Sequence, residues 1–109
     1  MFVIEQKSKK IILTRGDTAS MLIGVQDING KEYEFEDGDI ITFTMRKSPK
    51  SERALQLVAD ENHYIVFAPE DTNNLESGLY IYQVQLQSGD NIYTIVPTSF
   101  FELREDLVR

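Results

Sequence analysis

The chain has 109 residues, 41% of them hydrophobic, and a formal net charge of −7. This length suits one domain with a single two-layer core, which we expect to span residues 1–109. The negative charge argues against nucleic acid and anionic membrane surfaces as partners, because both attract clustered Lys and Arg. The absence of cysteine excludes disulfides, thiolate nucleophiles and Cys-based metal sites.

The start of the chain lacks the basic-then-apolar order of a signal peptide. No apolar run approaches the ~20 residues that a membrane helix needs. The lack of cysteine also favours a reducing compartment. We therefore expect a protein that is made in the cytoplasm.

Short alternating runs, separated by turn residues, follow one another along the whole chain. The predicted strands are residues 2–5, 11–14, 18–26, 39–46, 55–59, 64–67, 80–87, 92–96 and 99–105. Asn29-Gly30 predicts a hairpin after the third run, and the fifth and sixth runs are predicted to pair across residues 60–62. Residues 70–75 are predicted to form one short helical turn. Eight or nine short strands with a turn every ~8–12 residues indicate an all-β sandwich or barrel.

The strand predicted at residues 80–87 has a distinctive start. A polar crossover begins at Pro69, and Gly78 leads the chain into the strand. A Tyr just after such a crossover, here Tyr80, is typical of the tyrosine corner of immunoglobulin-like domains. We therefore predict an immunoglobulin-like antiparallel β-sandwich in which Tyr80 points inward and its hydroxyl bonds to the backbone.

The other side of this strand carries no charge. Its residues, which we call the contact face, are Leu79, Ile81, Gln83, Gln85 and Gln87. Neutral side chains of this kind resemble a surface made to contact protein more than one made to contact water alone. We predict that the contact face meets a partner protein or a second copy of the chain.

Acidic residues gather in one short segment before the fourth predicted strand. They are Glu32, Glu34, Glu36, Asp37 and Asp39. Clustered carboxylates can bind calcium, so a carbohydrate- or calcium-binding module is the alternative function. However, the acids alternate with Tyr33 and Phe35, as in a half-exposed strand whose charges discourage edge pairing. We favour this solvated strand and predict no bound metal.

Candidate catalytic residues are scarce. His63 is the single histidine, so no triad or two-His metal site can form within one chain, and we expect it to cap the preceding turn or start a strand. Arg15-Gly16-Asp17 matches a tripeptide that integrins recognise, but a Gly between two strands already suits a turn. No Gly-x-Ser-x-Gly elbow occurs. A sandwich that commits its large apolar residues to the core leaves little room for a cleft, so we predict no catalytic residue, no cofactor and no enzyme activity.

Two stretches carry a resemblance to known families. PEDT at residues 69–72, followed by GLYIYQV, resembles the corner that leads into strand F of an antibody variable domain. Tyr82 stands where that domain has its disulfide cysteine, and the chain has no Trp, so it is not of the antibody type.

The whole chain is more similar to small structural proteins of phages and prophages of Gram-positive bacteria. The similarity rests on the RGDT and PEDT segments, the later hairpin and the final FEL strand, in that order. The relatives in question are the N-terminal sandwich of baseplate upper proteins and tail-associated sandwich domains. This resemblance implies a non-enzymatic virion protein of the tail or baseplate, made in the bacterial cytoplasm, whose partners are other virion proteins or further copies of itself.

Overall fold

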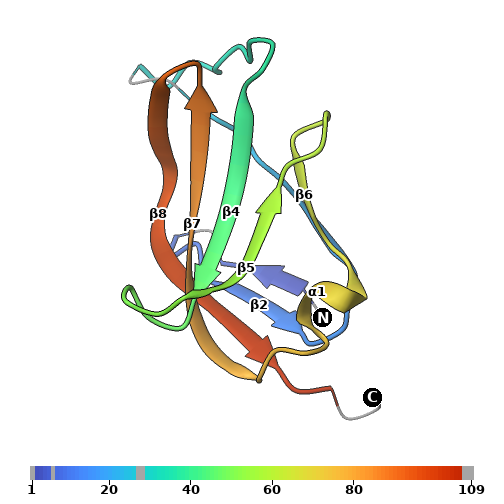
Figure 1. Cartoon of the computed structure of the whole chain (residues 1–109). Helices are drawn as coiled ribbons and strands as arrows, with labels where there is room; N and C mark the ends of the chain where they lie inside the picture. Colours follow the sequence, from blue (N-terminus) through green and yellow to red (C-terminus); the bar gives the residue numbers. More distant parts are fainter. Residues whose placement is uncertain (1, 6, 27–28, 107–109) are drawn as a thin grey trace.

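The protein is a two-layered β-sandwich (Figure 1). The computed structural model describes residues 2–5, 7–26 and 29–106. The larger sheet has the order β1 (Phe2–Ile4), β2 (Ile11–Thr14), β8 (Asn91–Arg104), β7 (Gly78–Ser88), β4 (Ile40–Arg46) and β5 (Arg53–Val58). The smaller sheet pairs β3 (Ala19–Leu22) with β6 (Tyr64–Phe67), and the short helix α1 (Pro69–Thr72) connects β6 to β7. The predicted immunoglobulin-like sandwich with one short helical turn is confirmed.

Alternation along the sequence explains which side chains enter the core. Strand side chains point to opposite faces in turn, so a run of alternating apolar residues buries one side. Ile41, Phe43 and Met45 of β4 are buried as predicted, and so are Val84 and Leu86 of β7. The intervening residues of both strands form the outer surface of the larger sheet.

Aromatic rings from both sheets meet at the centre of the core. Phe43 of β4 and Phe101 of β8 belong to the larger sheet, and Phe67 of β6 belongs to the smaller one. The ring centroids of Phe43 and Phe67 lie 5.3 Å apart, and those of Phe67 and Phe101 lie 5.9 Å apart. The first pair is edge-to-face and the second is tilted. Ring contacts of this kind add to the hydrophobic stabilisation of buried rings, so they hold the layers together.

The predicted pairing of residues 55–59 with residues 64–67 is wrong. β5 pairs with β4, whereas β6 pairs with β3 in the other sheet. The turn between them is closed by hydrogen bonds from the Asp60 N–H to the Tyr64 carbonyl and from the His63 N–H to the Asp60 carbonyl, both 2.9 Å long. Alternation identifies a strand but not its sheet. β6 crosses to the second layer because Ile65 and Phe67 are buried there against the larger sheet.

Several strand boundaries and one direction also differ from the prediction. The two strands expected at residues 92–96 and 99–105 form one continuous strand, β8. β2 runs parallel to β8, which is an exception to the predicted antiparallel arrangement. The strand expected at residues 18–26 ends at Leu22, because its antiparallel partner β6 begins opposite it, at Tyr64.

Residues 32–36 do not form the predicted strand. A single bridge joins Gln26 to Glu32, and the Tyr33 N–H donates to the Val25 carbonyl at 2.9 Å. The chain therefore reverses direction around Asn29-Gly30, where Gly30 adopts a positive φ of 78°, but the hairpin is short. Tyr33 and Phe35 still pack against the core while the acids point outward, so the predicted alternation holds without a strand.

The sandwich is covered unequally along the length of β7 and β8. β2 pairs with the last part of β8, from Phe101 to Arg104. The first part of β8 extends beyond β1 and β2 (Figure 1). We call residues 84–88 of β7 and 91–96 of β8 the open end, and the opposite end, which holds α1, Tyr80 and Phe101, the closed end.

Candidate protein-contact face

The tyrosine corner fixes the orientation of β7. Tyr80 is buried, and its hydroxyl donates a hydrogen bond of 2.6 Å to the Glu76 carbonyl, as predicted. Burial raises the pKa of this hydroxyl, so it stays a donor at neutral pH. The Lys47 ammonium lies 4.3 Å from the Tyr80 ring centroid, and Gly78 has a φ of 146° that favours glycine. Since Tyr80 is anchored inward, the residues between the buried positions must face outward.

The RGDT and PEDT segments, far apart in the sequence, contact each other beside this corner. The Gly16 N–H donates to the Thr72 hydroxyl at 2.8 Å, and Thr72 is fully buried. The Arg15 guanidinium donates to the Leu75 carbonyl at 3.4 Å. The tripeptide therefore joins the β2–β3 loop to α1, which favours the turn interpretation. Sequence reasoning missed this contact, although a Thr inside a short crossover helix is a plausible signal of a buried hydroxyl.

The structure brings all residues of the contact face together on the outer side of the larger sheet. β7 lies between β4 and β8, so neighbouring strands widen this surface. We call the wider surface the outer face. It adds Ile40, Thr42, Thr44, Arg46, Arg53, Gln56, Val58, Ile92, Thr94, Thr98, Phe100 and Glu102, which lie across from the contact face or next to it. Phe100 pairs with Ile81, so the largest exposed ring of the outer face lies beside an apolar member of the contact face.

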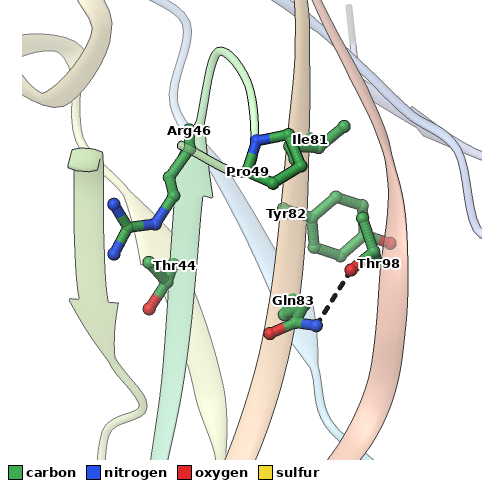
Figure 2. Close-up of a pocket in the computed structure, with 7 residues that line it drawn as sticks. All are labelled: Thr44, Arg46, Pro49, Ile81, Tyr82, Gln83 and Thr98. Atoms are coloured by element: carbon green, nitrogen blue, oxygen red, sulfur yellow. Dashed lines mark hydrogen bonds between the residues drawn. The ribbon is translucent and has the colours of Figure 1, made fainter. Parts of the chain in front are cut away.

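A shallow hollow lies on the outer face where β4 ends and the loop with Pro49 begins (Figure 2). Its volume is about 240 Å³, and it is lined by Thr44, Arg46, Pro49, Ile81, Tyr82, Gln83 and Thr98. A second hollow of about 300 Å³ shares Thr44, Arg46 and Gln83 with it and continues toward β5. The two hollows together form a groove across the strands, which a protruding side chain of a partner could enter.

Polar side chains on the outer face hold one another in place. Gln83 donates to the Thr98 hydroxyl at 2.9 Å, as the dashed line in Figure 2 shows. Gln56 donates to the Thr44 hydroxyl at 3.2 Å and accepts a bond of 2.5 Å from Arg53. Side chains that are already ordered lose less entropy when a partner binds. The outer face is therefore preorganised for contact.

The charge of the outer face differs from that of the whole chain. Among the described outward positions of β4, β5, β7 and β8, Glu102 is the one acid, although the chain has a net charge of −7. Its carboxylate forms ion pairs with Arg104 at 2.5 Å and with Lys10 at 3.2 Å. Both cations lower the pKa of Glu102, and Arg104 has the larger effect. Arg46 and Arg53 then leave the remainder of the outer face neutral to slightly basic.

The acidic segment lies on a different part of the surface. Glu32, Glu34, Glu36 and Asp37 are exposed, and Asp39 is partly buried. The Glu36 N–H donates to the Asp39 carboxylate at 3.0 Å, and the Tyr33 hydroxyl donates to it at 2.9 Å. The bond from Glu36, followed by the Ser88 hydroxyl, lowers the pKa of Asp39. Within residues 2–5, 7–26 and 29–106, no three His, Asp or Glu side chains gather closely enough to hold a metal ion.

His63 packs against an aromatic ring of the acidic segment. It lies between the Asp60 turn and β6, with a φ of 68°. The Asp60 carboxylate, which accepts from the N–H groups of Asn62 and Tyr64, caps the turn in place of the predicted His63. The His63 ring stacks on Phe35 with the centroids 3.7 Å apart, a contact that sequence reasoning missed. The stack fastens the acidic segment to the turn that precedes β6.

The expectation that large apolar residues are committed to the core is wrong. Exposed side chains include Val3, Leu22, Ile40, Val58, Tyr64, Val66, Leu79, Ile92, Tyr93 and Phe100. Openings of about 630 Å³ and 710 Å³ also lie at the open end. Most of these residues lie on the outer sides of the two sheets, which no further layer covers. Tyr93 lies on the inner side of β8 and is exposed because the smaller sheet has too few strands to cover the whole larger sheet.

In the part of the chain that the structure describes, no helix has the length and apolarity needed to cross a membrane. Comparisons with known proteins return no match: no protein-family model fits the sequence, and no curated protein or solved structure is significantly similar to it.

Proposed function

We propose that this chain is a non-enzymatic structural or adaptor protein of a phage or prophage virion, in the tail or baseplate, that acts by protein–protein contact. The observation that carries the proposal is the outer face, which is neutral to slightly basic, grooved, preorganised and open to a partner. The resemblance of the RGDT and PEDT order to phage structural proteins supports the virion role.

The size of the outer face indicates how it would act. Four strands about 4.8 Å apart, each contributing about eight residue steps of 3.3 Å, give a footprint of roughly 500 Å². A standard interface buries about 800 Å² per partner, so one such contact is weak. Symmetric repetition, as in a virion ring, would make many weak contacts stable together.

A charge-introducing double variant tests the contact. Ile81→Lys with Gln85→Glu places opposite charges on the contact face and preserves the net charge. We expect an unchanged melting temperature, with loss of incorporation into purified phage particles and of any self-association seen by light scattering. Charged side chains are disfavoured in the centre of an interface, because their desolvation is costly.

The matched control carries the same charges on the opposite sheet. Ser20→Glu with Val66→Lys changes two cross-strand neighbours on the outer side of β3 and β6. This control should assemble normally. Normal assembly of the Ile81→Lys, Gln85→Glu variant, or failure of both variants, would contradict a role for the contact face.

Calcium titration separates the proposal from the alternative of a calcium-binding module. We expect no saturable heat of binding at micromolar to low-millimolar calcium, the range of sensor and extracellular sites. A one-to-one isotherm that Asp37→Asn or Asp39→Asn removes would instead establish the acidic segment as a metal site.

A further inference from the structure

Apolar side chains on the inner side of β8 remain exposed at the open end. Tyr93 pairs with Leu86, which is buried, so both side chains lie on the inner side of the sheet. Tyr93 is nevertheless 51% exposed, and Ile95 is only partly buried. An inward-facing apolar residue stays exposed only where the opposite layer does not cover it. The open end therefore lacks part of its second layer.

Two openings occupy this uncovered region. The first, of about 630 Å³, is lined by Ile4, Lys9, Met21, Leu22, Ile23, Gly24, Val25, Gln26, Glu32, Tyr82, Ile95 and Val96. The second, of about 710 Å³, shares Gly24, Val25, Gln26 and Ile95 with the first and adds Tyr33 and Tyr93. The shared residues place the openings end to end between residues 24–26 and β8. Together they form one side cleft, which we call the open cleft.

The backbone of β8 is also unpaired along this cleft. β2 pairs with β8 only from Phe101 onward, and among the described residues β7 is the one strand that pairs with residues 91–96. An unpaired strand edge presents N–H and C=O groups that an extended peptide can bind. Pro97 lacks an N–H, so it sets one limit of such pairing. The available edge is then about six residues, or roughly 20 Å, long.

Carboxylates around the open cleft determine the charge of its occupant. Glu32 and Glu36 line the cleft, and Lys9 at the far side of the first opening is the one cation among its described lining residues. Tyr33 holds this segment in place, because its hydroxyl bonds to Asp39 at 2.9 Å and to Ser88 of β7 at 3.4 Å. A second copy of this acidic chain would bring the same carboxylates to the interface, and the repulsion would disfavour it. A basic peptide is complementary.

We propose that the open cleft binds an extended peptide segment of a partner protein, which adds a strand to the free edge of β8. Its alternate apolar side chains enter the cleft against Ile95 and Tyr93, and its Lys or Arg side chains meet Glu32 and Glu36. This site is separate from the contact face, which lies on the other side of the larger sheet.

The test uses a fluorescently labelled probe peptide, Lys-Val-Lys-Val-Lys-Val, and fluorescence anisotropy with the whole chain. Control peptides are Glu-Val-Glu-Val-Glu-Val and the basic peptide with alternate amides N-methylated, which cannot pair as a strand. We expect the basic peptide to bind at least about tenfold more tightly than either control, a difference of about 1.4 kcal/mol. Equal binding of the N-methylated peptide would overturn strand addition.

Variants of the chain locate the binding. Tyr93→Arg should weaken binding of the basic peptide about tenfold, whereas Tyr64→Arg, the same change on the outer side of the smaller sheet, should leave it unchanged. Glu32→Gln with Glu36→Gln should weaken binding and flatten its salt dependence. Melting curves check that each variant is folded, and equal binding by Tyr93→Arg and the original chain would overturn the site.

Two further outcomes distinguish this proposal from the role of the contact face. Ile81→Lys with Gln85→Glu should bind the basic peptide normally even if it fails to assemble. Suppose that the original chain is found to self-associate. If Tyr93→Arg abolishes that association and the contact-face variant keeps it, the occupant of the open cleft is a second copy of the chain, and the proposal of a basic peptide is overturned.

Discussion

The closed end and the open end are built from the same two strands, yet their inward-facing apolar side chains differ in how far they are buried. At the closed end, Tyr80 is 3% exposed and Phe101 is 0% exposed. At the open end, Tyr93, which lies on the same inner side of the sheet, is 51% exposed. The residue types are similarly apolar, so composition does not decide burial. Coverage by neighbouring elements decides it.

The closed end is covered by several elements that are hydrogen-bonded to one another. Thr72 of α1 receives the Gly16 N–H, and Tyr80 bonds to the Glu76 carbonyl. The open end is covered by residues 23–26 and the acidic segment, which form one isolated bridge instead of a strand pair. We infer that the closed end supplies most of the stability and that the open end is available for binding.

The largest expected effect concerns a core ring at the closed end. Phe67→Ala would leave a cavity between the layers and should lower the free energy of unfolding by about 3–5 kcal/mol. Tyr93→Ala, on the inner side of the open end, should lower it by only about 1 kcal/mol or less, because half of its side chain is already exposed. Urea denaturation of both variants measures the contrast, and similar losses would show that the two ends are equally important for stability.

Thr72 provides the next test, because its hydroxyl is the acceptor for a buried backbone donor. Thr72→Val keeps the shape of the side chain but leaves the Gly16 N–H without this acceptor. We expect a loss of about 1–3 kcal/mol in the free energy of unfolding, the cost of an unsatisfied buried polar group. Thr72→Ser, which keeps the hydroxyl, is the matched control and should retain more of the stability. Equal stability of the Val and Ser variants would remove the proposed importance of this bond.

The tyrosine corner should contribute less. Tyr80→Phe removes the hydroxyl that donates to the Glu76 carbonyl, and we expect a loss of about 1 kcal/mol, the typical net value of one hydrogen bond. Tyr93→Phe at the open end serves as the control and should have a smaller effect. An unchanged denaturation midpoint for Tyr80→Phe would argue against a stabilising corner.

The smallest expected effect is the pH dependence of Asp39 at the open end. Its pKa is lowered in the folded state, chiefly by the Glu36 N–H, so its ionised form stabilises the fold. This contribution is present above the ordinary pKa of 3.8 and is lost as the pH falls through the lowered folded value. Asp39→Asn should therefore be less stable than the original chain at pH 7, and the difference should shrink in acid. A difference that grows in acid would contradict this assignment.

The sequence predicted the parts of the fold that depend on local pattern. Alternation located β4, β6 and β7, and the crossover before Tyr80 identified the corner. The partner of β6, the parallel direction of β2 and the continuity of β8 depend on which layers meet in space, which alternation does not specify.

The contact face was found because a neutral row on one strand is visible in sequence. Its groove was not, since Thr44, Arg46 and Thr98 reach it from other strands. The open cleft was missed for the same reason. It exists because β2 pairs with only the last four residues of β8, Phe101 to Arg104. The number of paired residues depends on how two distant segments meet, so neither segment predicts it alone.

Cysteine labelling tests the central claim, contact through the outer face, most directly. Because the chain has no cysteine, Gln85→Cys and Ser20→Cys each introduce a single reactive thiol on an exposed position. Maleimide labelling rates are compared between the free chain and the chain in purified particles of the proposed phage virion. We predict that Gln85→Cys reacts at least about tenfold more slowly in particles, as expected of a buried interface position, while Ser20→Cys keeps its rate. Equal reactivity of Gln85→Cys in both states would contradict the account.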